Sequence, residues 1–429
     1  MQIINNPNKI DWSEILKRPT QTVNDIEGTV TRVFQDVIAR GDAAIKEYTV
    51  RFDGVDLESN IVSTEEIEAA VNVVAEPLKD AIKKAKHNIE VFHKAQKTTK
   101  VEVETTNGVS CWQEKRPIEK VGLYIPGGTA PLFSTVLMLA VPAQIAGCKE
   151  IVLCSPPNKK GELAPEILFA ANLCGVTKII KVGGIQAVAG LTFGTETIPQ
   201  VYKIFGPGNQ FVTVAKQLAT KHGVAIDMPA GPSELLVVAD KSANASYIAS
   251  DLLSQAEHGT DSQVILVSTS KDIIEKVSNE IEIQLEVLPR KAIAEKAIAN
   301  SKLIYVENHE VALKMINEYG PEHFIICTEA NDFYVNGIRN AGSVFIGDYT
   351  PESAGDYASG TNHTLPTNGF SKAYSGVNLD SFLKQMTFQK ISKEGLLNIG
   401  ETIELMAEAE GLQAHKNAVS IRLNDLRND

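Results

Sequence analysis

The segment Leu252–Gly259 carries two side chains whose types and spacing could bind a metal ion. Apolar residues before it recur at the spacing of one helix face, and Gly259 stands where a helix commonly ends. Gln255 and His258 are three residues apart, so we predict that they lie on the same face of this helix. An amide oxygen and an imidazole held side by side would form half of a metal site. The alternative is a polar helix end that faces solvent.

An adjacent acid and imidazole, Glu322 and His323, come directly before an apolar run that predicts a buried strand. Strand ends in open α/β sheets are common catalytic positions. Histidine is the usual general acid–base residue near neutral pH, and two adjacent side chains could serve separate proton transfers. The alternative is an ordinary surface pair in a loop.

Two later segments could complete the metal shell. The loop 353–363 is rich in Gly and Ser and has a length that favours a functional role. In it Asp356 could complete a metal shell, and His363 could do so too, but we expect His363 to be a structural histidine of the loop. The segment 408–417, which contains His415, reads on its own as a helix end with a solvated acidic face. The predicted nitrogen and oxygen shell suits zinc and would also admit Mn²⁺, and it consists of Gln255, His258, Asp356 and His415.

Two glycine-rich turns, Tyr124–Thr129 and Phe205–Asn209, follow predicted strands. Glycine lets the backbone approach a ligand closely, and the helix that starts after the second turn supplies free N–H groups for an anion. Neither turn is the Gly-x-Gly-x-x-Gly dinucleotide fingerprint. The turns therefore indicate either a phosphate or nucleotide contact or ordinary chain reversals.

Alternating strand and helix patterns position these residues. They predict an α/β fold with two Rossmann-like α/β domains, parallel-type sheets, and small helical N- and C-terminal segments. The predicted strands are 121–125, 151–154, 179–182, 203–205, 235–239, 264–268, 303–306, 324–327 and 344–346. The predicted parts are an N-terminal segment (1–22), a discontinuous main α/β domain (23–123 and 235–377), a second α/β domain (124–234) and a helical tail without strands (378–429).

Before the first predicted sheet the chain reads as helical. Ser63–Glu66 has the pattern of a capping box that opens a helix. The alternation in Val101–Glu104 and Val109–Trp112, on either side of Asn107–Gly108, predicts a β-hairpin with a type I′ turn.

Composition limits the class of protein. The chain has 429 residues, of which 43% are hydrophobic, and a net charge of −12, which argues against nucleic acid or an anionic membrane as a partner. Met1–Pro7 lacks the features of a signal peptide, and the longest apolar run, Val136–Val141, is too short to span a bilayer. Five scattered cysteines suit a reducing cytoplasm.

These segments resemble those of the histidinol dehydrogenase family over nearly the whole chain. The motifs that carry the resemblance are the turn at Tyr124, Asp227–Glu234, Ser254–Gly259, Pro321–His323 and Ala354–His363. One position departs from the family pattern, because Ile185 stands where a smaller residue is expected before Gln186.

The resemblance implies a homodimer that oxidises L-histidinol to L-histidine through L-histidinal in two NAD-dependent steps, with zinc bound by the four predicted ligands. It implies catalysis by Glu322 and His323, with His323 as the base and Glu322 activating water for the second step. It also implies that the second α/β domain contacts NAD and that the tail is exchanged between subunits. The implied substrate contacts are Ser233, Gln255, His258, His323, Asp356, Glu410 and His415. The implied NAD contacts are Tyr124, Gln186 and Asn209.

Three other classes remain open from the residues alone. A metal-dependent hydrolase or lyase would use the same shell without NAD, and a binding protein with two α/β lobes would need no catalyst. An aldehyde-type dehydrogenase would need a reactive cysteine, whereas Cys154 and Cys327 fall in predicted strands and read as core residues.

Overall fold

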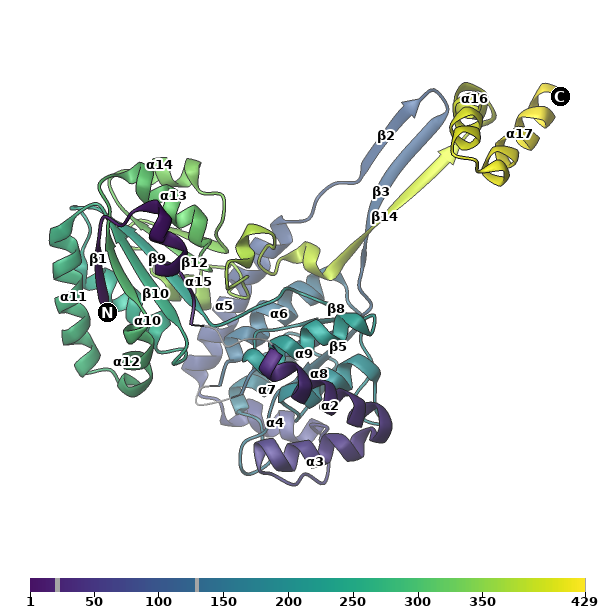
Figure 1. Cartoon of the computed structure of the whole chain (residues 1–429). Helices are drawn as coiled ribbons and strands as arrows, with labels where there is room; N and C mark the ends of the chain where they lie inside the picture. Colours follow the sequence, from purple (N-terminus) through teal and green to yellow (C-terminus); the bar gives the residue numbers. More distant parts are fainter. Residues whose placement is uncertain (20–23, 128–130, 429) are drawn as a thin grey trace. The chain divides into compact units, whose positions relative to one another are not determined.

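The computed structural model of the chain describes residues 1–19, 24–127 and 131–428, which divide into two units (Figure 1). Unit 1 comprises Met1–Ala95 and Ile118–Phe382, and unit 2 comprises Gln96–Pro117 and Leu383–Asp429. The boundary predicted between residues 22 and 23 lies outside the described residues.

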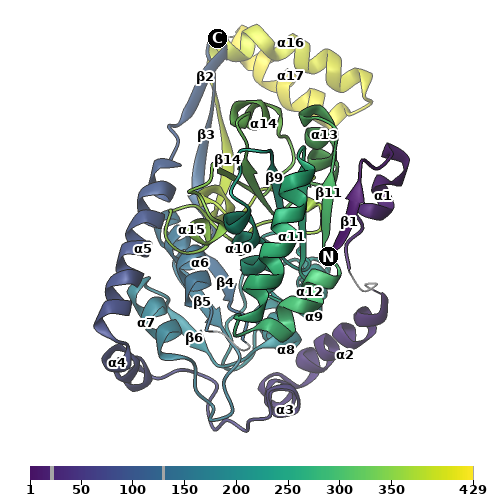
Figure 2. The same ribbon diagram turned by 90° about the vertical axis from the view of Figure 1, so that its left-hand side faces the viewer.

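The first sheet of unit 1 is parallel, with the strand order β1-β11-β10-β9-β12-β13. Its strands are β1 (Gln2–Asn5), β9 (Glu234–Ala239), β10 (Gln263–Ser268), β11 (Lys302–Tyr305), β12 (His323–Cys327) and β13 (Ser343–Ile346). Successive residues of a strand point to opposite faces. Leu235 and Val237 accordingly pack into the core shared with α10, α11 and α12, and Leu236 and Val238 into the core shared with α13 and α14. Figures 1 and 2 label these helices beside the sheet. These helices are α10 (Ala245–Ala256), α11 (Lys271–Glu286), α12 (Lys291–Ala299), α13 (His309–Tyr319) and α14 (Asn331–Gly337).

The second sheet of unit 1 is also parallel, with the order β6-β5-β4-β7-β8. Its strands are β4 (Lys120–Tyr124), β5 (Glu150–Cys154), β6 (Lys178–Ile180), β7 (Lys203–Phe205) and β8 (Ala225–Ile226). Leu123 and Leu153 face a core shared with α4–α7, whereas Val152 and Ile204 face a core shared with α2, α3, α8 and α9. These helices are α2 (Asn24–Arg40), α3 (Asp42–Asp53), α4 (Thr64–Val73), α5 (Glu76–Ala95), α6 (Phe133–Ala146), α7 (Pro165–Leu173), α8 (Gly184–Phe193) and α9 (Gln210–Lys221).

The two sheets, apart from the added edge strand β1, have the same strand order. In each, the first strand along the chain is central, and the order reverses between it and the fourth, which places switch points between β9 and β12 and between β4 and β7. Switch points of this kind open a crevice for ligands. The nine predicted strands are all present, and the prediction of two Rossmann-like parallel sheets is confirmed.

The helices between residues 24 and 95 belong to a different half of unit 1 from the one predicted. Their buried residues share both cores of the β4–β8 sheet, whereas residues 23–123 were grouped with the sheet of residues 235–377. The N-terminal residues 2–5 supply β1 to that other sheet by pairing with β11. An amphipathic pattern shows that a helix buries one face, but not which sheet covers that face.

A local sequence pattern in unit 1 predicted its structure correctly. The predicted capping box is confirmed, since the Ser63 hydroxyl accepts from the Glu66 N–H and the Glu66 carboxylate accepts from the Ser63 N–H. Two short helices, α1 (Trp12–Ile15) and α15 (Glu352–Tyr357), and three 3₁₀ turns (Lys9–Asp11, Phe370–Lys372, Leu379–Phe382) complete the unit. Within the described ranges, no helix is long and apolar enough to cross a membrane.

Unit 2 is built on the predicted hairpin and on a strand that was not predicted. β2 (Val101–Thr106) and β3 (Val109–Pro117) form the hairpin, and β14 (Leu383–Ile391) pairs antiparallel with β3. The prediction that no strand follows residue 378 is therefore wrong, because the alternation in β14 forms a strand only against the edge of β3. The prediction of a type I′ turn is also wrong. Such a turn needs a positive φ at both central residues, but of Asn107 and Gly108 only Gly108 has one, and the register shifts before the turn. Two helices, α16 (Lys393–Ala409) and α17 (Gln413–Asn428), close the chain.

Candidate active site

The predicted catalytic pair lies at the amino edge of the first sheet. Glu234 begins β9, His323 begins the neighbouring strand β12, and His323 is in register with Leu235. Helix α10 returns from the carboxyl end of β9 to the same edge, so Gln255 in its last turn comes back beside the strand starts. The site therefore lies at the β9/β12 switch point, but at the amino ends of the strands rather than at the carboxyl ends, which are the common position.

The His323 ring is buried, and its two nitrogens have different surroundings. Nδ1 lies 3.3 Å from the Glu234 carbonyl oxygen and 3.3 Å from Glu352 Oε1, so it carries a proton. Nε2 has no hydrogen-bond partner and lies 3.7 Å from Asp356 Oδ1. In the neutral ring the free lone pair is therefore on Nε2, which is the nitrogen that can accept a proton.

The charges around His323 and Glu322 shift both groups. Burial lowers the pKa of His323, but the carboxylates of Glu352, Glu322 and Asp356 outweigh it and raise that pKa to about 10. Burial raises the pKa of Glu322 to about 8, even though Glu322 Oε2 accepts a 2.9 Å hydrogen bond from the Glu234 N–H. Carboxyl and imidazole groups with pKa values shifted in this way are typical of acid–base sites.

Three of the four predicted metal ligands belong to unit 1 and lie around this pair. Gln255 is fully buried, and its amide nitrogen donates to Glu352 while its oxygen accepts from the Glu234 N–H at 3.0 Å. His258 follows the C-cap of α10, so it is not on the helix itself, and it lies within electrostatic reach of Asp356 and His323. Asp356 lies on α15.

The donor chemistry of these residues fits a divalent metal ion. An amide oxygen has two lone pairs, so Gln255 can accept from Glu234 and still face a cation. Together with the carboxylate of Asp356 and the imidazole of His258 it offers the nitrogen and oxygen ligands that zinc accepts. In the part of the chain that the structure describes, no three His, Cys, Asp or Glu side chains are grouped to hold a metal. The predicted shell takes only two such residues from unit 1.

Both ring nitrogens of His363 have partners in unit 1, which supports the structural role that the sequence indicates. Its Nδ1 lies 2.9 Å from the Asp356 carbonyl oxygen, and its Nε2 lies 3.1 Å from the Thr135 hydroxyl on α6. The next contact along the same loop is from the Asn362 amide, which donates to the Met138 carbonyl at 2.6 Å. The loop therefore joins Asp356 to the half of unit 1 that carries the second sheet.

The predicted NAD residues lie at the carboxyl edge of that second sheet. Tyr124 ends β4 and Asn209 caps α9 shortly after β7, so both are at the β4/β7 switch point. The Tyr124 hydroxyl accepts from the Gly184 N–H at 3.1 Å. Gln186 on α8 is fully buried, and both polar atoms of its amide lack a hydrogen-bond partner. Buried amides are rarely unpartnered, so these atoms fit contacts to a bound ligand.

The turn after β7 is held by a buried ion pair. Gly206 has φ +126°, and a Cβ there would lie 2.0 Å from the Tyr124 carbonyl oxygen, so only glycine fits. Asp227 accepts from the Gly206 N–H at 2.8 Å, and Lys216 donates to the Gly206 carbonyl at 2.8 Å. Lys216 and Asp227 also pair with each other. In the other predicted turn, residues 128 and 129 lie outside the described residues.

The remaining predicted residues are placed as follows. Ser233 is half-buried directly before β9. Ile185, the departure from the family pattern, is buried in the core beneath α8, where its extra bulk is accommodated. Glu410 and His415 are exposed residues of unit 2, at the end of α16 and in the first turn of α17, and they are not part of the geometry described for unit 1.

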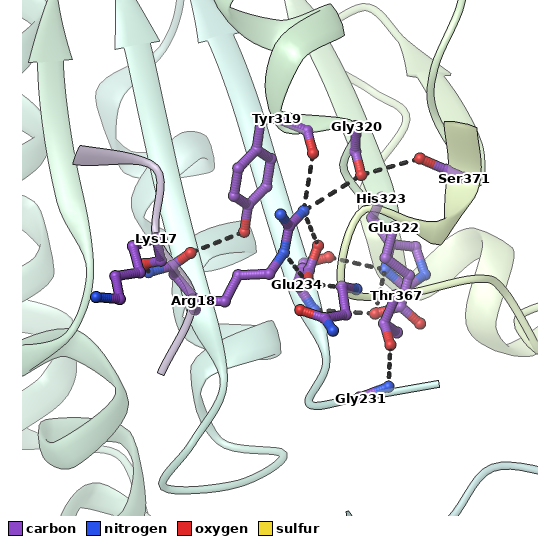
Figure 3. A network of polar contacts seen from close by, with 12 residues as sticks. Lys17, Arg18, Gly231, Glu234, Tyr319, Gly320, Glu322, His323, Thr367 and Ser371 are labelled. Atoms are coloured by element: carbon purple, nitrogen blue, oxygen red, sulfur yellow. Dashed lines mark hydrogen bonds and ion pairs between the residues drawn. The ribbon is translucent and has the colours of Figure 1, made fainter. Parts of the chain in front are cut away.

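Four charged residues to which the sequence assigned no role lie around these sites, three of them buried (Lys216, Glu234 and Glu352) and one half-buried (Arg18). Arg18 pairs with Glu234, Glu352 contacts His323, and Lys216 holds the turn after β7 (Figure 3 shows the first of these). Glu234 begins β9, and Glu352 begins α15. Charged residues are seldom buried, so a charged residue at the start of a buried segment was the signal that could have identified them.

The cysteines do not provide a nucleophile in unit 1. Burial raises the pKa of Cys148, Cys154, Cys174 and Cys327 to about 12, so these thiols stay protonated and unreactive at neutral pH. This geometry disfavours an aldehyde-type mechanism with a cysteine nucleophile.

Comparisons with known proteins give a consistent result. The family model for histidinol dehydrogenase matches residues 16–423. The chain is 57% identical over 427 residues to a histidinol dehydrogenase from Bacteroides thetaiotaomicron, with all of both chains covered. It is 52% identical over 429 residues to the one from Escherichia coli K12, covering 97% of this chain and 98% of that one. A crystal structure of histidinol dehydrogenase from Elizabethkingia anophelis matches with a TM-score of 0.97 and 54% identity, covering 100% of this chain and 99% of that chain. The chain therefore belongs to the histidinol dehydrogenase family.

Proposed function

We propose that this protein oxidises L-histidinol to L-histidine through L-histidinal, at the end of histidine biosynthesis, with two molecules of NAD as oxidant and zinc as a bound metal. The observation that carries the proposal is the unpartnered Nε2 of His323, which is buried beside Glu322 and among residues able to hold a cation. Family membership supports the substrate.

In the first step His323 removes the hydroxyl proton of the alcohol through Nε2. The N–H at Nδ1 keeps its hydrogen bond to the Glu234 carbonyl. This contact fixes the ring so that Nε2 faces the substrate. The carbon–hydrogen bond breaks at the same carbon, and its hydride leaves for NAD, which gives the aldehyde, NADH and a proton.

In the second step the aldehyde gains water before a second hydride can leave. We assign activation of this water to Glu322, whose raised pKa lets the carboxyl group exchange a proton near neutral pH. His323 again removes a hydroxyl proton, now from the hydrate. The products are the carboxylic acid, a second NADH and a second proton, so atoms and electrons balance over the two steps.

Gln255, His258, Asp356 and His415 would hold the zinc ion. Bound there, the ion would supply a positive charge that orients the substrate and offsets the charge of Asp356, so the pKa of His323 would fall toward that of a base. The unit 1 substrate contacts on this edge are Ser233, Gln255, His258, His323 and Asp356, and Glu410 and His415 would be added from a tail.

Tyr124, Gln186 and Asn209 would contact NAD, which supplies the oxidant. Their position at a switch point and the unpartnered amide of Gln186 support this assignment. The glycine at position 206 allows the backbone to approach a ligand closely.

We further propose a cytoplasmic homodimer with exchanged tails. The free cysteines suit a reducing compartment. Several apolar side chains of α16 and α17 are exposed, including Leu405, Met406 and Ile421, and these would be covered by a second subunit.

A single assay tests the proposal. Purified protein with L-histidinol and NAD should form two NADH per histidinol consumed, and histidinal supplied directly should yield one. A metal-dependent hydrolase or a binding protein would form none. Absence of histidinol-dependent NADH in zinc-loaded, folded protein would refute the proposed function.

A further inference from the structure

The N-terminal arm, residues 1–19, brings an arginine to the amino edge of the first sheet. β1 adds to the sheet edge beside β11, and Trp12 is buried in the core beneath α13. The Lys17 carbonyl accepts from the Gln263 amide at 3.0 Å, and Gln263 in turn accepts from the Tyr319 hydroxyl at 2.9 Å. The arm is thus fixed up to Lys17, the residue directly before Arg18.

The Arg18 guanidinium makes its hydrogen bonds through Nε and Nη2 (Figure 3). Its Nε and Nη2 donate to the two carboxylate oxygens of Glu234, the second at 2.8 Å. Nη2 also donates to the Tyr319 carbonyl at 2.9 Å, and the guanidinium lies 3.9 Å above the centre of the Tyr319 ring. A two-pronged contact of this kind fixes the angle of a carboxylate, which the single charge of a lysine does not.

Glu234 connects this contact to the catalytic pair. Its side chain is held by Arg18 and by the Asn368 N–H at 2.6 Å, while its own N–H donates to Glu322 and its carbonyl faces His323 Nδ1 at 3.3 Å. The side chain and the two backbone groups belong to one residue at the start of β9. A change in the side-chain angle therefore moves the groups that orient both catalytic residues.

The charge of Glu234 also needs Arg18. The carboxylate is 2% exposed, and Arg18 is the cation that pairs with it. Removing one partner of a buried pair leaves an uncompensated charge, which would draw Glu234 away from its present position.

We propose that Arg18 is a positioning residue for the reaction: its two-pronged contact holds Glu234, and the backbone of Glu234 holds Glu322 and His323. This inference deepens the proposed function and rests on it. Arg18 touches neither catalytic side chain, so it acts through the groups that it holds, which are the Glu234 carboxylate and the Tyr319 carbonyl.

The test compares Arg18→Ala and Arg18→Lys with the control Arg40→Ala in the full-length, zinc-loaded protein. Arg40 forms a similar fork on Asp36 at the surface of α2, outside the site. We expect Arg18→Ala to lower kcat roughly tenfold or more with both histidinol and histidinal, with KM for histidinol changed less than about threefold. Guanidinium chloride at low millimolar concentration should restore part of the Arg18→Ala rate, whereas equal sodium chloride should not. Arg18→Lys should lose less activity and gain nothing from guanidinium, and Arg40→Ala should match the unaltered protein.

Each outcome decides the matter. Unaltered kcat per folded molecule in Arg18→Ala, or a loss that equals the loss of folded protein by circular dichroism and is not restored by guanidinium, would overturn the inference. If Arg18→Ala does not fold, Arg18→Lys decides, because an unaltered kcat there shows that the fork is not needed. Failure of the unaltered protein to form NADH would instead count against the proposed function.

Discussion

The backbone N–H of Glu234 donates a 2.9 Å hydrogen bond to the carboxylate of Glu322. The two residues begin, or directly precede, neighbouring strands, β9 and β12, on either side of the switch point. The start of one strand therefore orients the acid that precedes the next, and an isosteric change at Glu322 can remove its acid–base function while keeping this hydrogen bond.

Glu322 and His323 should affect the two oxidation steps differently. Glu322→Gln keeps an oxygen for the Glu234 N–H but cannot take a proton from water, so it should slow oxidation of supplied histidinal by roughly 100-fold and histidinol oxidation to the aldehyde much less. His323→Asn should slow both steps. Rates of NADH formation with each substrate measure this, with the exposed Glu318→Gln as control. A Glu322→Gln variant impaired only in the alcohol step would contradict the assignment.

Removal of the metal should abolish histidinol oxidation. The predicted ligands are nitrogen and oxygen donors that a strong chelator outcompetes, and added zinc should restore the rate. Metal analysis should find about one zinc per subunit, and His258→Ala should bind less, because one imidazole ligand is lost. A fully active preparation with far less metal than protein would show that the assignment is wrong.

The tail should act in the partner's site, and mixed dimers can show it. His415→Ala and His258→Ala should each be inactive as homodimers. In a mixed dimer one site would combine intact His258 from the first chain with intact His415 from the second, so about half of the activity per dimer should return. If verified mixed dimers stay inactive, the tail acts within its own chain.

Lys216 should matter for NAD and not for histidinol. Lys216→Met leaves Asp227 buried without its cation and frees the Gly206 carbonyl, so we expect a loss of about 3–5 kcal/mol in stability and a KM for NAD raised roughly tenfold. Adding Asp227→Asn should recover stability, by thermal melting, without recovering the KM for NAD. An equal rise in the KM for histidinol would contradict a role limited to the NAD turn.

Asp53 should destabilise the protein above pH 6. It ends α3, where the helix dipole disfavours a negative charge, one of its oxygens is buried without a partner, and burial raises its pKa to about 6. A folded-state pKa above the unfolded value means that stability falls as pH rises between about 4 and 6 and stays lower above that range.

Asp53→Asn should therefore raise the free energy of unfolding at pH 7.5 by on the order of 1 kcal/mol and have little effect at pH 4. Denaturant unfolding at both pH values measures this difference. The exposed Asp56→Asn on the following loop is the control. A gain of equal size at both pH values would show that ionisation of Asp53 is not the cause.

Much of the fold could be predicted because its signals are local. Each of the nine strands could be recognised from a short apolar run, because both of its faces are buried. The capping box could be recognised because its two side chains lie within one helical turn. The strands β1 and β14 could not be predicted, since each exists only through pairing with a strand far away in sequence, β11 and β3. The assignment of the early helices to a sheet depended on the same kind of distant contact.

For the candidate site, too, residues with a local signal could be predicted, and residues that depend on a distant contact could not. Glu322, His323, Gln255 and Asp356 could be singled out by residue type and by motif, and the structure brings them together. Arg18 could not, because nothing near residue 18 reveals that its partner is Glu234. The buried ion pair of Lys216 and Asp227 was missed for the same reason.

The N-terminal arm has a consequence for folding. β1 pairs with residues 302–305, and Arg18 meets a partner 216 positions later. Contacts between such distant residues are slow to form, because a long loop has to close before they contribute any stability. On the ribosome the arm is made before β11 and α13, and it finds its place only after they have been synthesised. The arm is thus synthesised before its partners and ordered only after them, so the predicted catalytic pair stays loosely held until the arm has docked.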